Sequence, residues 1–588
     1  MNSKYKKLEL CWPGKDIGVK PEPRVLIEDP DKSYGEADTQ NMLIHADNLL
    51  ALKALEQKFT GKIKCIYIDP PYNTGNAFEY YDDGLEHSLW LDLMSQRINI
   101  LKKLLSKDGF FCCHIDDSEG AYLKVLLDEI FGRNNYLTTF YIRVRYPNKT
   151  LKQDMDFHKE IEQVHIYRKE YGAKPNLNQS EITFDKFNFF ISEKGKGKEI
   201  ELGGKKVTVF QKGEYEIEQR EKGTEFGLKE IWATGSILDG NSSGRFFRDH
   251  LTGRYETDGL GVLYKVYGIG EDRFDYRYFT GPQRIGATKG KYFQGVPVDK
   301  LENETSMKET PINNFYDLAG SFGNCRSEGG VAFRSGKKPE KLLNLIINHF
   351  SNEGDWVLDS FLGSGSTMAV AHKMNRKWIG IELGNHANTH CLPRINAICE
   401  GIDQTGISKD VNWKGGGGFK FYNLAPSLLN KDKYNQWVIN PNYNADLLAA
   451  AMAKQEGFLY NPSESIVWKQ GSASENHFIY TTTNTITRDV VEQILSEMKP
   501  DESLRICCIA FVEGCNTIDA RIEIKKIPEV LLGNCEFGKE DYSTEINIVN
   551  MPLDPNRPSF VPSYIQPESK PTTAKIKKND PLQTNLLF

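Results

Sequence analysis

Residues 66–78 read IYIDPPYNTGNAF, and this stretch indicates how the first half of the chain should fold. The apolar, β-prone run of residues 65–68 predicts a buried strand. The two prolines after Asp69 can neither continue a helix nor donate to a sheet ladder, so they hold a stiff, extended turn at the end of that strand. Because ligands of open α/β sheets bind at the carboxyl ends of the strands, we expect Asp69 and Tyr72 to face a ligand.

The sequence on both sides of this turn alternates between extended and helical patterns. A short strand and a helix that starts at Asp47 precede the turn. An amphipathic stretch over 89–109, the strand FFCCHI and a helix over 121–132 follow it. This alternation predicts a parallel sheet in an α/β domain, whose first half we assign to residues 40–135.

The helix-strand rhythm stops after that half and returns later in the chain. Residues 136–330 contain strand-like pieces between Gly- and Lys-rich loops, and the helical and extended patterns resume within 331–429. One α/β domain is therefore predicted to be interrupted by a large insertion. We assign the other parts to an N-terminal extension, an α+β region and a flexible tail rich in Pro, Lys, Thr and Asn, at residues 1–39, 430–555 and 556–588.

A second motif, FLGSGS, follows the strand of the second half. Gly363 and Gly365 permit a tight turn and the close approach of a ligand to backbone N–H groups at the start of a helix. Glu382 closes the next strand, where an acid accepts hydrogen bonds from ribose hydroxyls. A dinucleotide fingerprint would place a further glycine at Met368, so the turn favours a nucleoside without a pyrophosphate, such as S-adenosylmethionine. By itself, a G-x-G turn is also typical of a merely tight connection.

Composition limits the kinds of partner, metal site and cellular compartment that the chain could have. The net charge of −6 gives no global nucleic-acid footprint, so any contact with DNA must be local. The 11 cysteines show no C-x-x-C spacing, which argues against a zinc site, any other metal centre of that kind and a disulfide scaffold. The N-terminus lacks an apolar signal region and no stretch is apolar enough to span a bilayer, so we expect a protein of the reducing cytoplasm with no membrane partner.

Taken together, the two motifs resemble those of the amino-group DNA methyltransferases, in the β class where DPPY precedes the cofactor motif. The resemblance covers most of residues 40–140 and 330–400, and in length and region order the chain is most similar to the modification subunit of type III restriction-modification systems. It implies a Rossmann-like, S-adenosylmethionine-dependent sheet interrupted by a target-recognition insertion. It also implies methylation of adenine N6 in double-stranded DNA, a homodimer and a helicase-nuclease partner subunit.

The resemblance assigns catalysis to Asp69, Pro70, Pro71 and Tyr72. An exocyclic amine is a poor nucleophile. The Asp69 carboxylate and the Pro70 carbonyl would accept hydrogen bonds from its two N–H groups and so favour the more nucleophilic form of the nitrogen. Tyr72 offers a face for base stacking, worth on the order of 1–3 kcal/mol. The base must be flipped out of the duplex to reach these groups. The alternative for Asp69 is a strand-end acid that caps a turn.

The cofactor residues carried over from the family are Phe361, Gly363, Ser364, Gly365 and Glu382, with Lys338 beside the methionine end and Asp47 near the adenosine. At 45–48 the chain reads HADN where relatives usually have a glycine before the acid. Two of these residues have simpler interpretations: Lys338 as a solvated lysine before a helix-start proline, and Asp47 as a helix N-cap.

The insertion is the predicted target-recognition domain, by its position in the family. Candidate DNA contacts are Arg143, Arg145, Lys149 and Lys152. An edge strand whose charges discourage aggregation is the alternative for each of them. The closing LQTNLLF resembles peptides that bind sliding clamps, against the alternative of a frayed tail.

Four other functions stay open at this stage: an orphan methyltransferase, a cytosine-N4 enzyme, an RNA methyltransferase, and a non-enzymatic DNA-binding specificity subunit. The intact motif residues argue against the last of these. No G-x-x-x-x-G-K-[ST] motif occurs, so a partner would have to supply ATP hydrolysis and DNA cleavage.

Overall fold

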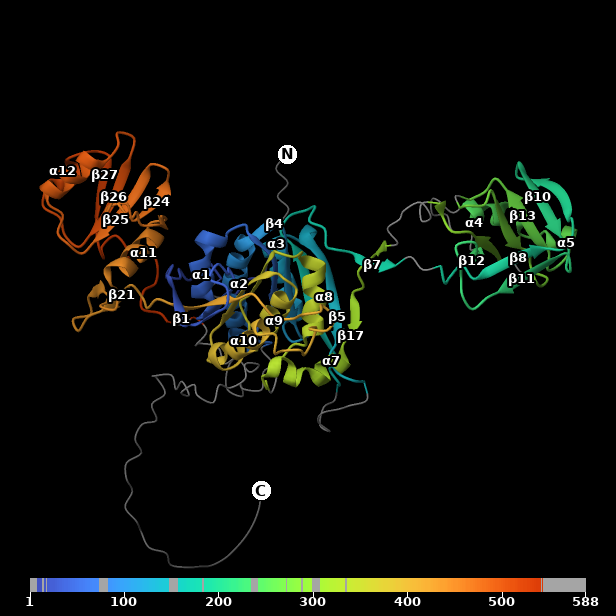
Figure 1. The fold of residues 1–588 in the computed structure, drawn as a ribbon, viewed down its shortest axis with the longest axis horizontal. Helices are drawn as coiled ribbons and strands as arrows, with labels where there is room; N and C mark the ends of the chain where they lie inside the picture. The colour runs from blue at the N-terminus through green and yellow to red at the C-terminus, as the bar shows by residue number, and fades with distance from the viewer. Residues whose placement is uncertain are drawn as a thin grey trace, which may run out of the picture. The chain divides into compact units, whose positions relative to one another are not determined.

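The computed structural model describes residues 8–542 apart from 13–14, 17, 73–82, 148–156, 182–183, 234–241, 271, 287–288, 299–306, 334–335 and 541. The chain divides into two compact units (Figure 1). The larger unit contains residues 1–176 and 313–588, and the smaller contains residues 177–312. The predicted tail and its clamp-like peptide lie outside the described residues.

A ten-stranded sheet forms the centre of the larger unit, with the strand order β1-β20-β2-β19-β18-β3-β4-β6-β5-β17. The strands from β20 to β4 are parallel, whereas β6 is antiparallel to β4 and β5, and β1 to β20. The inner strands are nearly continuous apolar runs because both of their faces are buried. The strand bounds are Leu26–Tyr34 (β1), Met42–His45 (β2), Ile63–Ile68 (β3), Leu105–Ile115 (β4), Tyr136–Arg143 (β5), Ile161–Arg168 (β6), Phe315–Asp317 (β17), Trp356–Asp359 (β18), Lys377–Glu382 (β19) and Phe419–Leu424 (β20).

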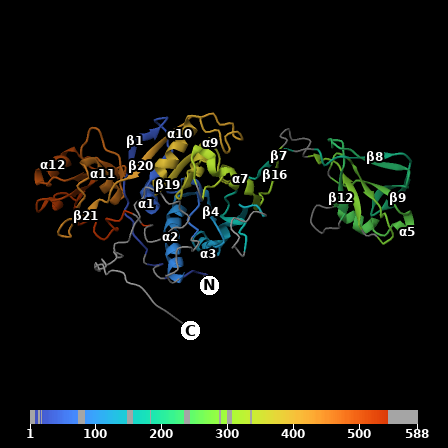
Figure 2. The same cartoon turned by 90° about the horizontal axis from the view of Figure 1, so that it is seen from below.

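Helices cover both faces of this sheet. On one side α1 (Asn48–Phe59) contacts α2 (Asp83–Leu104), which contacts α3 (Gly120–Phe131). A second group is formed by α8 (Glu340–Phe350), α9 (Ser366–Lys373) and α10 (Leu392–Cys399). Figure 2 shows α2 and α3 on one side of the sheet and α9 and α10 on the other. The sheet and its two helical layers agree with the predicted Rossmann-like α/β class.

The chain leaves the middle of this sheet in opposite directions. From β3 it passes through α2 to β4, and from β18 it passes through α9 to β19, on the other side of the β18–β3 pair. Ligands of open α/β sheets bind at such a switch point, outside the carboxyl ends of the strands. Both sequence motifs follow the two strands that flank it.

The predicted bounds of the insertion, 136–330, are too wide. β5, β6 and β17 belong to the central sheet, and the separate unit is residues 177–312. The paired strands β5 and β6 bury Phe140, Ile142 and Val164 in the larger unit. The sequence pattern predicts both segments as strands but assigns them to the insertion, because only their pairing with β4 and with each other shows that they belong to the central sheet.

The N-terminal extension also contributes to the central sheet and to its core. Its strand β1 pairs with β20, and Trp12 joins the main core cluster. Because β1 lies at the sheet edge, its residues are half-buried or exposed. The sequence of this strand therefore shows no apolar pattern. The boundary predicted at residue 39 therefore separates two parts that fold together.

The smaller unit is built on a six-stranded antiparallel sheet with the order β12-β15-β14-β13-β10-β9. Two strand pairs, β8 with β11 and β7 with β16, accompany it. The bounds are Asn178–Glu181 (β7), Phe189–Glu193 (β8), Lys198–Leu202 (β9), Lys205–Phe210 (β10), Tyr215–Gln219 (β11), Lys229–Ala233 (β12), Leu263–Tyr267 (β13), Tyr276–Thr280 (β14), Gly290–Gln294 (β15) and Met307–Thr310 (β16), with short helices at Ser242–Phe246, Phe247–Leu251 and Tyr255–Asp258. An aromatic-rich core, including Phe247, Tyr264 and Phe279, holds this sheet.

The C-terminal region has its own five-stranded sheet, β23-β24-β25-β26-β27, of which β25 to β27 are parallel. Its elements are α11 (Ala445–Gln455), β23 (Leu459–Tyr460), β24 (Gly471–Ser474), β25 (His477–Thr482), α12 (Arg488–Glu497), β26 (Ser503–Cys508) and β27 (Ile522–Lys526), preceded by the pair β21 (Leu429–Lys431) and β22 (Trp437–Ile439). Helices and strands are thus mixed here, as predicted for residues 430–555. Over the described part of the chain, no helix has the length and apolarity that a membrane span requires.

Candidate active site at the switch point

The two motif turns leave adjacent parallel strands. β3 and β18 are paired, with Ile66 opposite Leu358, so their carboxyl ends meet at the same sheet edge. Asp69 follows β3, and Asp359 ends β18. The structure therefore brings together two turns that are almost 300 residues apart in the sequence, with Asp69 and Gly363 as their central residues.

The DPPY turn is held by contacts on both sides. The Trp90 indole N–H donates to the Pro71 carbonyl at 2.8 Å, and Trp90 is fully buried. The Tyr72 hydroxyl lies 2.9 Å from Asp69 Oδ1 and 3.1 Å from Glu162 Oε2, and its one proton can serve either acceptor. Burial and the nearby Asp69 carboxylate raise the pKa of Tyr72 well above its usual value, so the phenol stays protonated. The segment after Tyr72, residues 73–82, lies outside the described residues.

Lys338 reaches this turn from the segment before α8. Its ammonium lies 3.2 Å from Asp69 Oδ1 and 3.1 Å from Glu162 Oε2, it donates to the Tyr72 hydroxyl, and it is 4.8 Å from the centre of the Tyr72 ring. Burial lowers the pKa of Lys338, but the two carboxylates outweigh it and raise that pKa overall. Lys338 was predicted beside the methionine end of a cofactor or as a solvated lysine. Its side chain is buried and contacts Asp69 and Tyr72 of the DPPY turn.

Two residues of this cluster were missed in the sequence. Glu162 lies on β6, and its Oε2 is 2.8 Å from Nε2 of His114 on β4. Nδ1 of His114 lies 2.8 Å from the Tyr67 hydroxyl on β3. Burial raises the pKa of Glu162, yet Lys338 and His114 hold it below its usual range, so Glu162 is ionised. β6 is antiparallel, so its amino end reaches the carboxyl edge of the parallel strands, and only the topology reveals that Glu162 is there.

The glycine-rich turn places its two glycines differently. Gly363 has φ +56°, and a Cβ there would meet no atom within 4 Å, so the space beside it is open. Gly365 has φ +77°, and a Cβ there would lie 2.5 Å from Met368 Cε. Gly363 therefore gives access to the backbone, whereas Gly365 permits close packing and begins α9.

Glu382 fastens this turn to the next strand. It accepts the Gly363 N–H at 2.7 Å on Oε2 and the Gly384 N–H at 2.8 Å on Oε1, and it is buried. A carboxylate has about four acceptor sites, so two backbone donors leave capacity for further hydroxyl donors. The remaining acceptor sites of Glu382 and the open space at Gly363 fit the ribose hydroxyls of a nucleoside cofactor.

Asp359 is a buried acid between the two motifs. It accepts the Thr367 hydroxyl at 2.6 Å and the Phe361 N–H at 2.9 Å. Burial raises its pKa to about 7, and the charges of Asp69 and Glu382 add to that shift. The switch point is therefore rich in carboxylates, with Lys338 as the cation among them.

A buried network of ion pairs contacts the glycine-rich turn at the Ser364 carbonyl. Arg394 donates to the Ser364 carbonyl at 3.1 Å and pairs with Glu340 at 2.7 Å. Glu340 in turn pairs with Lys373 at 2.9 Å, and all three side chains are completely buried. These residues fix the position of Ser364 without lying on the open side of the turn.

Asp47 is placed by the structure as the N-cap of α1. Its Oδ1 accepts the Leu50 N–H at 3.0 Å, and its Oδ2 lies 3.3 Å from Arg97 and 3.2 Å from the Tyr542 N–H. The N-cap interpretation is confirmed, and a contact of Asp47 with the adenosine stays a prediction. Phe361 is partly buried against the core cluster.

Two of the four predicted DNA contacts, Arg143 and Arg145, lie within the described residues. Arg143 lies on β5 in the larger unit and pairs with Glu160 at 3.2 Å and Asp317 at 3.1 Å. Arg145 follows that strand and is half-buried. Lys149 and Lys152 lie outside the described residues. Contact of these four residues with DNA stays a prediction, and Arg143 would have to leave two carboxylates to reach a phosphate.

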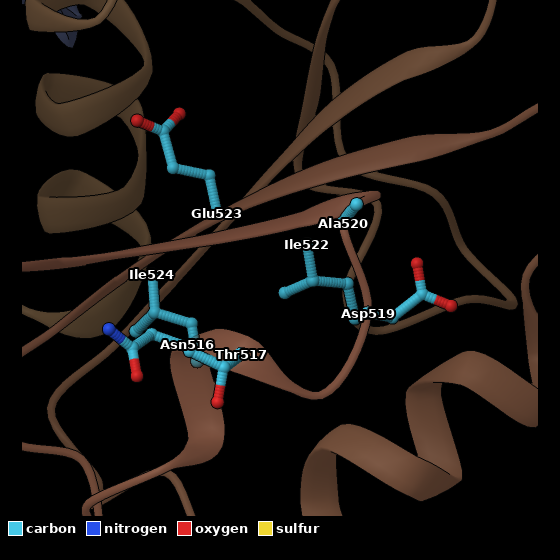
Figure 3. Close-up of a pocket in the computed structure, with 7 residues that line it drawn as sticks. All are labelled: Asn516, Thr517, Asp519, Ala520, Ile522, Glu523 and Ile524. Carbon is cyan, nitrogen blue, oxygen red and sulfur yellow. The ribbon is translucent and has the colours of Figure 1, made fainter.

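Other features of the described chain lie apart from this site. A hollow at β27 is lined by residues 516–517, 519–520 and 522–524, none of which belongs to the two motifs (Figure 3). Among the described residues, no three His, Cys, Asp or Glu side chains are grouped so that they could hold a metal ion.

Comparison with known proteins gives the site a family context. Residues 63–390 match the family model described as DNA methylase. The chain is 33% identical over 418 residues to the probable type III restriction-modification enzyme HindVI Mod subunit of Haemophilus influenzae, covering 66% of this chain and 54% of the relative. It is 26% identical to the type II methyltransferase M.EcaI of Enterobacter cloacae (71% and 81% covered) and 24% identical to the type III restriction-modification enzyme EcoPI Mod subunit of Escherichia phage P1 (63% and 61% covered). The chain thus spans about half the length of the first of these relatives.

Proposed function

Because the chain belongs to the DNA methylase family, we propose that it is a site-specific DNA methyltransferase that uses S-adenosylmethionine to methylate adenine N6. The observation that carries this proposal is the meeting of the DPPY turn and the glycine-rich turn at the switch point of one sheet. One turn offers acceptors for an amine, and the other offers open space beside Gly363 and the carboxylate of Glu382 for a nucleoside. Neither function requires residues from outside the larger unit.

The chemistry follows from what the side chains can do. S-adenosylmethionine supplies an electrophilic methyl group when bound beside Gly363 and Glu382. The Asp69 carboxylate and the Pro70 carbonyl accept hydrogen bonds from the two N–H groups of the amine. These hydrogen bonds turn the lone pair of the amine toward that methyl group. The rigid proline turn holds these acceptors in place, which supplies orientation. As the amine nitrogen forms its bond to the methyl carbon, the bond between that carbon and the sulfonium sulfur would break and leave a neutral thioether, and the nitrogen would release one proton to solvent.

The choice of adenine over cytosine is part of the proposal and rests on residue 69. In the family, Asp at this position favours adenine N6, whereas cytosine N4 enzymes more often carry Ser. Tyr72 would supply a stacking surface for the flipped base once Lys338 moves from its ring face.

We further propose that the chain is the modification and specificity subunit of a type III restriction-modification system. The similarity to two Mod subunits supports this assignment. In this proposal residues 177–312 recognise the target sequence, two copies form a homodimer on double-stranded DNA, and a separate helicase-nuclease subunit supplies cleavage. A DNA substrate in a bacterial cell agrees with the reducing cytoplasm that the cysteines predict.

The test uses the full chain with methyl-labelled S-adenosylmethionine and a mixture of DNA and RNA. We expect label in DNA only, and hydrolysis should yield N6-methyladenine. The Asp69→Ala variant is the matched negative control. Label in N4-methylcytosine would overturn the adenine assignment, label in RNA would overturn the DNA assignment, and no transfer to any nucleic acid would reject enzymatic activity.

A further inference from the structure

A half-buried carboxylate outside both motifs contacts the groups that occupy the proposed catalytic acceptor. Glu162 Oε2 is 3.1 Å from the Lys338 ammonium, 3.1 Å from the Tyr72 hydroxyl and 2.8 Å from His114 Nε2. Lys338 and Tyr72 are the two groups that also contact Asp69 Oδ1. Glu162 and Asp69 therefore share the same two partners.

This sharing matters because both groups contact the same oxygen of Asp69, Oδ1. If the substrate amine is to donate to Oδ1, the Tyr72 proton and the Lys338 ammonium must weaken or leave their contacts with that oxygen. The side chain of Lys338 is only 8% exposed, so water cannot replace a lost partner. An ammonium left unpaired in a buried site is strongly unfavourable. A second acceptor must therefore be present if Oδ1 of Asp69 is to be available to the base.

We propose that Glu162 is a positioning residue that takes over Lys338 and Tyr72 when the target amine binds to Asp69. The proposal rests on the proposed adenine methylation. Its geometry requires no movement of the backbone, because both partners already lie within 3.1 Å of Glu162 Oε2. His114 Nε2 lies 2.8 Å from the same oxygen and holds the carboxylate in place, and the Tyr67 hydroxyl orients the His114 ring in turn.

The position of Glu162 in the fold supports this role. It is carried by β6, the antiparallel strand beside β4, so it enters the site from a different side than either motif. Over the described residues, no hydrogen bond or ion pair joins Glu162 directly to the glycine-rich turn, and its link to that turn runs through Lys338, whose backbone carbonyl accepts the Ser366 hydroxyl at 2.8 Å. Loss of its charge should therefore affect the binding and reaction of the amine while leaving the affinity for S-adenosylmethionine unchanged.

The first experiment is a double-mutant cycle with Glu162→Gln and Lys338→Met, measured as single-turnover methylation at saturating S-adenosylmethionine. Glu162→Gln keeps the shape and one acceptor oxygen but removes the charge that Lys338 needs. We expect the rate to fall on the order of 10- to 100-fold, with calorimetric affinity for S-adenosylmethionine retained. In the Lys338→Met background the same change should have a much smaller effect, because no buried ammonium remains to be paired.

The second experiment measures DNA binding in the absence of turnover. Once the methylated adenine has been mapped, its duplex is compared with one that carries purine, which lacks the N6 amine, at that position. The unmodified chain should prefer adenine, and Glu162→Gln should lose that preference. Glu162→Asp, which keeps the charge, should recover part of it. Glu502→Gln serves as the matched control, since Glu502 is a buried carboxylate paired with Lys469 in the C-terminal region.

The outcomes separate this inference from the proposed function. An unmodified chain that methylates nothing refutes the proposed function. An active unmodified chain whose Glu162→Gln variant keeps its full rate and its adenine preference refutes the role of Glu162. An equal loss of rate in both Lys338 backgrounds also refutes it, because Glu162 would then act independently of the ammonium.

Discussion

Replacing Asp69 by Asn or by Ala distinguishes two roles for the acid of the DPPY turn. A general base would be lost equally in both variants, since neither side chain takes up a proton. A hydrogen-bond acceptor would survive in Asn, which keeps an oxygen close to the position of Oδ1. Because Lys338 still lies 3.1 Å from Glu162, the Asn variant does not strand the buried ammonium. We therefore expect Asp69→Asn to retain measurable methylation.

The size of the difference follows from the contacts of Asp69. Its side chain is 18% exposed, and Oδ1 accepts from the Tyr72 hydroxyl at 2.9 Å, so an amine would meet an oriented acceptor with little competing water. Removing such an acceptor should cost on the order of 1–3 kcal/mol beyond the Asn variant, or ~10- to 100-fold in rate. The assay is single-turnover methylation with saturating S-adenosylmethionine, with calorimetry to show that both variants bind the cofactor. Equal rates in the two variants would refute the acceptor mechanism and favour proton abstraction.

Three further predictions address the other parts of the chain. Gly363→Val should abolish binding of S-adenosylmethionine, because it fills the open side of the turn and forces a branched residue to φ +56°, and unchanged calorimetric affinity would contradict this. Exchanging residues 177–312 for the corresponding unit of a relative should change the methylated sequence, whereas sequencing that finds the original site still methylated would reject the mapping of recognition to this unit. The raised pKa of Asp359 means that folding takes up a proton, so its burial lowers the free energy of unfolding progressively as pH rises from about 4 to about 7. Asp359→Asn should therefore be more stable than the unmodified chain above pH 7, by up to about 4 kcal/mol, and should have no such advantage at acid pH. Urea unfolding measures this difference, and an equal difference at both pH values would exclude the linkage.

The sequence was sufficient for the parts of the site that follow strands with a clear pattern. Residues 65–68 are apolar and end at two prolines, and residues 377–382 end at Glu382, so the apolar pattern alone locates the carboxyl ends of both strands. Parallel strands share one edge, and this rule brings Asp69 and Glu382 to the same edge of the sheet. The support for Ser364 by Arg394 could not be predicted, because ion pairs between distant helices and turns leave no periodic signal.

Glu162 and the edge strands show where sequence reasoning fails. Glu162 lies at the beginning of its strand, so the rule that placed the other acids would assign it to the opposite edge of the sheet. The reversal of β6 depends on how β4, β5 and β6 pair, which is a property of long-range contacts. β1 and β5 were assigned to an extension and an insertion because edge and near-edge strands bury fewer residues than central strands do.

The charges at the switch point also affect which is bound more tightly, the cofactor or the product that remains after methyl transfer. Asp69 and Glu382 both act electrostatically on the buried Asp359, and Glu162 shares Lys338 with Asp69. In the proposed reaction, a cofactor with a positive sulfonium would be attracted to this excess of carboxylates, and methyl transfer would convert that sulfonium to a neutral thioether. The same carboxylates would therefore favour the cofactor over its product, and the attraction is stronger away from bulk water. Glu162 reduces the conflict that this arrangement creates, because it keeps Lys338 paired and leaves Asp69 free to accept the amine.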